Sequence, residues 1–334
     1  MATNEMIRRK FQSGTESVRG TAVAATRIVY ADISQSYDRP LQEFPDRSGT
    51  YISRRRPVNN RPTVGFSGSD MLTFEDILLW MQLGVKNVAS GVSDSGTPTP
   101  GYTWDFTPSA EVDDLASWTL EHGEPGNVYE SDQFMLNSWT MRINPDSDGA
   151  WMWDFQALAR NWESSTYTGS IPQRETEVIR APGTKVYLDS STIGTTQQVG
   201  KIIDFSLSCN LNLHMKAFME NDTSWAKNRV GRQARTFDAV MTVEFDDDVE
   251  FANFRADTPV KRKIRVVREG STIHTTVKKT AQIDLYGYYN AISFGDREGN
   301  MTAQFAIQGF YDSTAATDCK FSVVNTLAKA PGDV

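Results

Sequence analysis

Residues Asp204–His214, DFSLSCNLNLH, carry the most regular pattern in the chain and indicate its fold class. Apolar and polar side chains alternate here without a break, from Phe205 to Leu213 on one side and from Asp204 to His214 on the other. Strict alternation is typical of a β-strand with one buried and one solvated face. We therefore predict a mainly β protein whose strands each present a polar side.

Two more stretches show the same alternation around a turn. In the later one, residues 301–308 alternate, residues 282–285 supply the partner strand, and GDREGN between them is predicted as the turn. In the earlier one, NPDSDG connects residues 139–143 with residues 151–155. Both stretches are predicted to be long hairpins with one wet face.

These hairpins belong to a pattern that occurs twice. Residues 64–160 and 239–311 each read as a strand, a short helix, an edge-like strand and a long hairpin. Thr73 with Asp76, and Asp247 with Glu250, are predicted capping boxes at the starts of the two helices. Preserved order with low identity indicates a duplicated structural unit.

Composition limits the functional classes. The chain has 334 residues, which suggests about two domains, and a net charge of -8 from 42 acids and 34 bases, which argues against a protein that grips nucleic acid. Its N-terminus lacks the apolar segment of a signal peptide, and no stretch is long and apolar enough to span a bilayer. With two cysteines, we expect a soluble protein assembled in a reducing cytoplasm.

Catalytic and metal motifs are weak. The three histidines, His122, His214 and His274, are far apart in sequence and have no ligand partner at helical spacing. The acidic run 246–248 lacks calcium-loop spacing and is explained better by helix capping, and the acids of NPDSDG by turn formation. We expect no enzyme activity, no cofactor and no metal site.

Basic clusters occur at residues 8–10, 54–56 and 261–263. They are open to three interpretations: nucleic-acid contact, solvated surface charge, or contact with acidic patches on another copy of this acidic chain. Nucleic-acid contact needs interleaved aromatic residues on one face, which two of the three clusters lack.

The ordered set of blocks resembles the tail tube proteins (major tail proteins) of long-tailed bacteriophages, in the form with a duplicated tube domain. The resemblance rests on GTAVAATRIVYAD from Gly20, TFEDILLWMQLG, YTWDFTP from Tyr102, ASWTLEHGEP, and the hairpins ending in DFQALAR and QFAIQGFYDS. It implies two tandem β-sandwich or barrel-like modules, each with one short α-helix and with long hairpins that join neighbours in a closed inner β-barrel.

The resemblance also implies an organisation and partners. The expected segments are a flexible N-terminal arm (1–19), a first tube module (20–180), a second tube module (181–328) and a C-terminal tail (329–334). Homotrimeric, pseudo-hexameric rings would stack into a tube, with a hexamer of this chain as the alternative. The expected partners are the tape measure protein, the tail terminator and baseplate proteins, with DNA passing through the lumen, and the expected location is the virion tail.

If the wet faces line the lumen, the expected lumen-facing residues follow from the alternation. They are Ser206, Ser208, Asn210, Asn212, Gln282, Asp284, Thr302, Gln304, Gln308, Thr140, Arg142, Asp154 and Gln156. Expected contacts between subunits or rings involve Arg54, Arg55, Arg56, Asp246, Lys261, Arg262 and Lys263. The first-copy counterpart of the 201–215 strand is less clear, with residues 20–32 as the candidate.

A different class of function stays open. A two-module β-sandwich that recognises carbohydrate or a virion surface would use exposed aromatic rings as stacking platforms, and Trp118 or Trp162 is the candidate.

Overall fold

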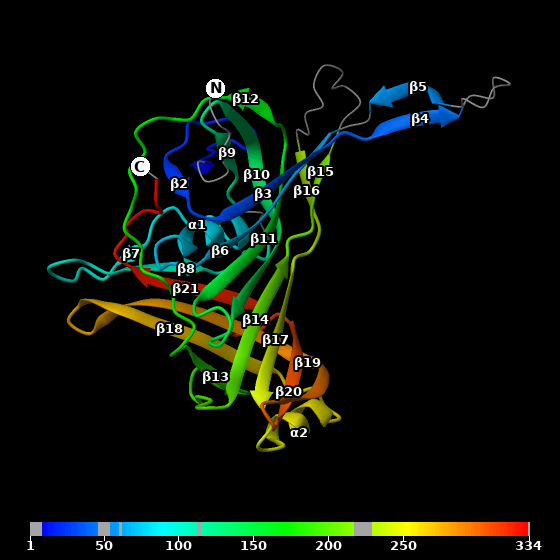
Figure 1. The fold of residues 1–334 in the computed structure, drawn as a ribbon. Coiled ribbons are helices and arrows are strands. Elements are labelled where there is room, and N and C mark those ends of the chain that lie inside the picture. Colours follow the sequence, from blue (N-terminus) through cyan, green and yellow to red (C-terminus); the bar gives the residue numbers. More distant parts are fainter. Residues whose placement is uncertain (1–8, 46–53, 60–61, 112–114, 217–228, 333–334) are drawn as a thin grey trace.

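The computed structural model describes residues 9–45, 54–59, 62–111, 115–216 and 229–332 (Figure 1). The fold is mainly β, with 55% of residues in strands and 5% in helices, as the alternation predicts. One antiparallel sheet dominates and is called the main sheet below. In spatial order it contains β3 (Asp32–Asp38), β6 (Thr63–Met71), β11 (Trp151–Ala159), β10 (Asn127–Ile143), β14 (Ile202–Asn210), β17 (Thr236–Glu244), β20 (Asn300–Gly309) and β19 (Val277–Arg297).

Two smaller sheets pack against the main sheet and share its two longest strands. The N-terminal half of β10 pairs into a sheet with β1 (Lys10–Thr15), β2 (Arg27–Val29), β9 (Trp118–Glu124) and β12 (Glu163–Ser165). The N-terminal half of β19 pairs into a sheet with β13 (Lys185–Asp189), β18 (Arg262–His274), β21 (Cys319–Asn325), β8 (Tyr102–Phe106) and β7 (Val92–Ser93). β10 and β19 thus connect the layers.

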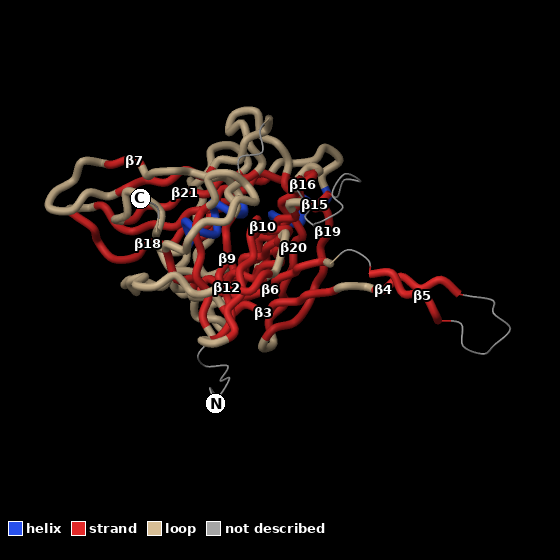
Figure 2. Tube along the Cα trace, turned by 90° about the horizontal axis from the view of Figure 1, so that it is seen from above, coloured by secondary structure: helices blue, strands red, loops and turns tan. Residues whose placement is uncertain are grey.

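The described residues form two helices and two further hairpins. α1 (Ile77–Gly84) is buried on all sides, whereas α2 (Val249–Arg255) lies at the surface beside β19. The hairpin of β4 (Leu41–Pro45) and β5 (Arg54–Asn59) projects far from the body, as Figure 2 also shows, and β15 (Leu213–Lys216) pairs with β16 (Arg229–Arg232). Each of these hairpins follows the first main-sheet strand of its half of the chain.

The core lies between the main sheet and the smaller sheets. Alternation along β10 and β11 directs Trp139 and Trp153 inward, where their rings stack 4.4 Å apart, and Trp80 of α1 packs on Phe155 at 4.7 Å. Burying a side chain of the size of Phe or Leu stabilises the fold by roughly 1.5–3 kcal/mol. The apolar side of each main-sheet strand is therefore held inward, and the polar side is left on the other face.

The same strand pairings occur twice along the chain. In the first half β1 pairs with β9, β9 and β12 with β10, β10 with β11, β11 with β6, and β6 with β3. The second half repeats these pairings in the same order: β13 pairs with β18, β18 and β21 with β19, β19 with β20, β20 with β17, and β17 with β14. β10 of the first set pairs directly with β14 of the second, which joins the two sets into one sheet.

The structure corrects three expectations about elements. Residues 10–15 are part of the expected loose arm but form β1, because Phe11 is buried and Gln12 and Ser13 are buried with it. The counterpart of β14 is β3, whereas most of the 20–32 candidate precedes it. β20 pairs with residues 287–297 of β19, so the turn is only Glu298–Gly299, and the predicted partner 282–285 lies in another sheet.

Candidate functional surface: the polar face of the main sheet

A continuous row of outward side chains crosses every strand of the main sheet. The registers place in one line Asp32, Ser69, Asp154, Thr140, Ser208, Asp238, Gln308 and Tyr288. Directly opposed residues in an antiparallel pair share one face, so this row defines a single surface, called the polar face below. The row continues without a break from β10 to β14, where the two sets of strands meet.

Most of the expected lumen-facing residues lie on the polar face. They are Thr140, Arg142, Asp154, Gln156, Ser206, Ser208, Asn210, Thr302, Gln304 and Gln308. The alternation in sequence therefore groups residues from four strands, β10, β11, β14 and β20, on one surface.

Three expected residues lie elsewhere. Asp284 is 4% exposed and pairs with Arg265 at 2.7 Å, and Gln282 donates to Asp284, both in the β18–β19–β21 sheet. Their placement on the polar face is wrong because β19 leaves that sheet near Gly287. Asn212 follows the end of β14 with a positive φ of 49°, which ends the alternation.

The polar face also contains residues that the sequence interpretation missed. β3 contributes Asp32, Ser34 and Ser36, and β6 contributes Ser67 and Ser69. Their signal was present, since serines recur at every second position in DISQSYD and VGFSGSDM. The strand is hard to recognise in the sequence because Gly68 takes an apolar position, opposite Ile33 of β3.

The cations on the polar face are paired with carboxylates. Arg142 donates from Nε to Asp154 at 2.6 Å and lies 3.3 Å from Asp148, and the hydrogen bond with Asp154 raises the pKa of Arg142. Arg297 at the end of β19 pairs with Asp146 and lies 3.9 Å from Asp204. Burial raises the pKa of the Asp238 carboxyl at the centre of the face. Hydroxyls, amides and acids thus dominate the surface, with little uncompensated positive charge.

Over its first half, the polar face is hollowed. One shallow depression is lined by Asp32, Ser69, Thr140 and Asp154 from four strands, and a neighbouring one by Ser36 and other residues of β3, β6 and β11. Both depressions are open to solvent, and neither is an enclosed apolar pocket of the kind that binds a small ligand.

The expected contact residues lie beside α2 and at the start of β18, or have side chains outside the described part. Arg54, Arg55 and Arg56 belong to β5, and their side chains lie outside the described part. Asp246 pairs with Lys201 at 2.9 Å, and Lys261 and Lys263 lie 3.5 and 3.9 Å from Asp312. Arg262 is 5% exposed and donates to Glu250 at 2.6 Å, so its expected role at a surface contact is wrong. The reason is that β18 starts there and directs the side chain under α2.

Glu250 also departs from the expected capping box. Instead of reaching back along α2, its carboxylate accepts hydrogen bonds from Arg262 and from the Tyr289 hydroxyl at 2.6 Å. In the first helix, Thr73 does accept from the Asp76 amide at 2.9 Å, although α1 itself begins at Ile77.

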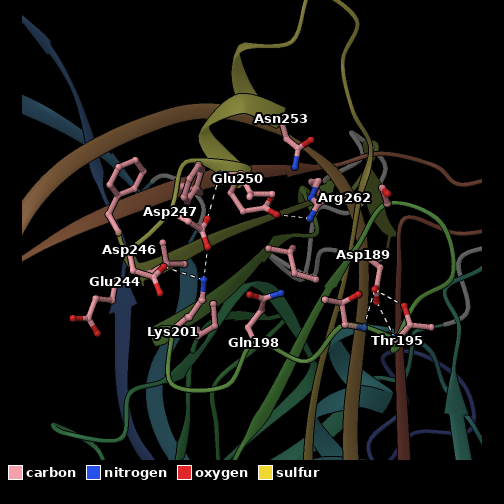
Figure 3. Close-up of a pocket in the computed structure, with 18 of the residues that line it drawn as sticks. Asp189, Thr195, Gln198, Lys201, Glu244, Asp246, Asp247, Glu250, Asn253 and Arg262 are labelled. Carbon is pink, nitrogen blue, oxygen red and sulfur yellow. Dashed lines mark hydrogen bonds and ion pairs between the residues drawn. The ribbon is translucent and has the colours of Figure 1, made fainter.

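A pocket of about 430 Å³ lies beside α2 (Figure 3). Both of its cations are paired with carboxylates: Lys201 with Asp246 and Asp247, and Arg262 with Glu250. Asp189 accepts hydrogen bonds from the backbone of residues 194–196. The Thr195 hydroxyl donates to the Asp189 carboxylate at 2.6 Å, so this acid holds the loop that follows β13.

The histidines and tryptophans singled out in the sequence lie in separate parts of the fold. His122 is buried beside Ser131, and burial lowers its pKa to about 3; His274 contacts Asp94 at 2.7 Å. His214 lies in β15, and among the described residues no cluster of three potential metal ligands forms. Trp118 is 0% exposed and the Arg27 guanidinium lies 4.6 Å from its ring, so it is no sugar platform, and Trp162 packs against the core.

Comparison with known proteins adds no assignment. No protein-family model matches the sequence, and no curated protein matches it. Within the described residues, none of the helices has the length and apolar character needed to cross a membrane.

Proposed function

We propose that this chain is a structural virion protein that assembles into stacked rings and forms the hollow tail tube of a long-tailed bacteriophage. The observation that carries the proposal is the polar row that crosses all eight strands of the main sheet. A sheet buried on one face and polar on the other over its whole width suits the wall of an aqueous channel.

The repeated pairings support two tube modules in one chain. Each half supplies four strands to the main sheet in the same order, β3-β6-β11-β10 and β14-β17-β20-β19. Three chains would supply six such sets and about 24 strands, more than the 16–18 that already enclose water in porins. Because both sets share one polar face, a trimeric ring is favoured over a hexamer that keeps one set outside.

The charges of the polar face suit passing DNA. Arg142 and Arg297 are paired with carboxylates, and the chain carries a net charge of -8. Such a wall offers phosphates few partners and repels them weakly, which favours movement over binding. The tape measure protein, tail terminator and baseplate proteins are the proposed partners, and the virion tail is the proposed location.

Electron microscopy of the concentrated full-length chain tests the proposal. We expect rings with threefold symmetry and a central channel, and stacks of such rings. Particles that stay single globular subunits at every concentration, with analytical ultracentrifugation giving only the monomer mass, would overturn it.

A further inference from the structure

The two ends of the main sheet are open. β3 pairs with β6 on one edge, and among the described strands none pairs with its other edge. At the far end, residues 288–297 of β19 pair with β20 on one edge and with no described strand on the other. Unpaired edges are templates for strand addition.

The chain already contains a joint between such edges. β10 is the last strand of the first set and β14 the first strand of the second, and they pair antiparallel from Ser138↔Asn210 to Ile143↔Phe205. β19 holds the place of β10 in its set, and β3 holds the place of β14. We propose that β19 of one chain joins β3 of a second copy in the register of the internal β10–β14 joint, an inference that rests on the proposed ring.

A shared bulge fixes which residues correspond. The β10–β11 ladder skips Asn137, and the β19–β20 ladder skips Asn290, so Ser138 corresponds to Ala291. Opposite these residues stand Gln156 and Ala306, and the ladders continue from Gln156 through Ser67 to Ser34 and from Ala306 through Val240 to Ser206. Ser34 therefore corresponds to Ser206.

Transferring the internal register gives the joint between copies. The opposed pairs are Ala291↔Asp38, Ile292↔Tyr37, Ser293↔Ser36, Phe294↔Gln35, Gly295↔Ser34 and Asp296↔Ile33. Ser293 and Ser36 then both lie on the polar face, while Ile292, Phe294 and Tyr37 lie on the core side. A slip of one residue would exchange these faces.

Burial supports this register. At the internal joint the core-side residues Trp139, Met141, Leu207 and Cys209 are all buried. Their counterparts at the open edges are less covered: Phe294 is 46% and Tyr37 49% exposed. Phe294 stands where Met141 stands and Tyr37 where Cys209 stands, so pairing of the edges would cover apolar surface that the single chain leaves in water.

Disulfide trapping in assembled rings tests the joint. In the proposed register, Ser36→Cys combined with Ser293→Cys places two thiols directly opposite each other, within disulfide-bonding distance. Ser34→Cys combined with Ser293→Cys places them diagonally across the joint, two residues out of register and farther apart. All three serines are exposed, and the native Cys209 and Cys319 are buried, so the two variants are matched. After mild oxidation we expect covalent species up to a trimer on non-reducing gels, with linkage roughly tenfold stronger for the 36/293 pair.

The outcomes separate the joint from the ring. Rings in the microscope with preferential linkage of the 34/293 pair, or with no linkage of either pair, would overturn the register and leave the tube proposal standing. A wild-type chain that forms no rings would remove the tube proposal, and with it the joint. Mass spectrometry of the linked peptide identifies the residues in either case.

Discussion

At the scale of single residues, Asp70 is a buried acid that the fold holds at a cost. Its carboxylate accepts a hydrogen bond from Trp80 Nε1 at 2.7 Å, beneath α1. Burial, the largest effect, and the nearby Asp76 charge raise the pKa of Asp70 from 3.8 to about 6, although the hydrogen bond from Trp80 and the charge of Arg174 oppose this. At neutral pH the folded state therefore contains a charge that the unfolded state would solvate better.

Replacing Asp70 with Asn should stabilise the protein at high pH. Above about pH 6 the carboxyl is ionised in both the folded and the unfolded state, and burial of the charge lowers the free energy of unfolding by its full amount. As the pH falls from 6 towards 3.8, the folded carboxyl takes up a proton before the unfolded one does, and this destabilisation disappears. Asn retains an acceptor for Trp80. We expect Asp70→Asn to raise the free energy of unfolding by roughly 1–3 kcal/mol at pH 8 and by almost nothing at pH 4.

Urea denaturation at both pH values measures this effect. Glu175→Gln removes an exposed acid and should change the unfolding free energy little at either pH. Equal stabilisation by Asp70→Asn at pH 8 and pH 4 would show that the carboxyl titration is not the cause.

At the scale of elements, β19 decides how the layers connect. It pairs with β21 up to Leu285, with β18 up to Gly287 and with β20 from Gly287 on, so one strand leaves the second small sheet and enters the main sheet. A Cβ added at Gly287 would overlap the backbone carbonyl oxygen of Gln308 and lie 3.0 Å from Ile307 Cγ2. Only glycine leaves room for the backbones at this crossing.

Gly287→Ala should therefore destabilise the chain. The clash is with backbone, which cannot rotate away, and we expect a loss of about 1–3 kcal/mol in unfolding free energy by thermal or urea denaturation. Gly169→Ala is the control, because a Cβ there meets nothing within 4 Å. A Gly287→Ala protein as stable as Gly169→Ala would contradict the close approach.

Local elements could be predicted where side-chain periodicity decides them. The alternation identifies β14, the apolar stripe around Trp80 identifies α1, and NPDSDG is the turn between β10 and β11. The course of β19 could not be predicted, because residues 282–285 and 301–307 alternate equally well and only tertiary packing selects residues 287–297 as the partner of β20. β1 was missed because its buried face includes Gln12 and Ser13, which carry no apolar signal.

At the scale of the whole molecule, the two halves are connected by more than the chain. β10 pairs with β14 through the main sheet, and β8 of the first half pairs with β21 near the C-terminus. No sequence pattern marks either pairing, since their partners are roughly 60 to 220 residues apart. The polar face could thus be predicted strand by strand, whereas its continuity across eight strands depends on these long-range ladders.

The charge of the polar face provides the last prediction. Asn210 and Gln304 are exposed on this face, and replacing both with Lys would give the proposed tube two added cations per chain facing DNA. In water, two opposite unit charges 4 Å apart attract each other by ~1 kcal/mol when salt does not screen them. We therefore expect intact tails that eject DNA roughly fivefold more slowly at low salt, and a smaller slowing at high salt, where ions screen the attraction. Gln173→Lys, at an exposed loop position outside the main sheet, adds one cation away from the polar face and should leave ejection unaffected. Fluorescence of released DNA from purified virions gives the rates, and identical rates for all variants at low salt would mean that DNA does not pass along this face.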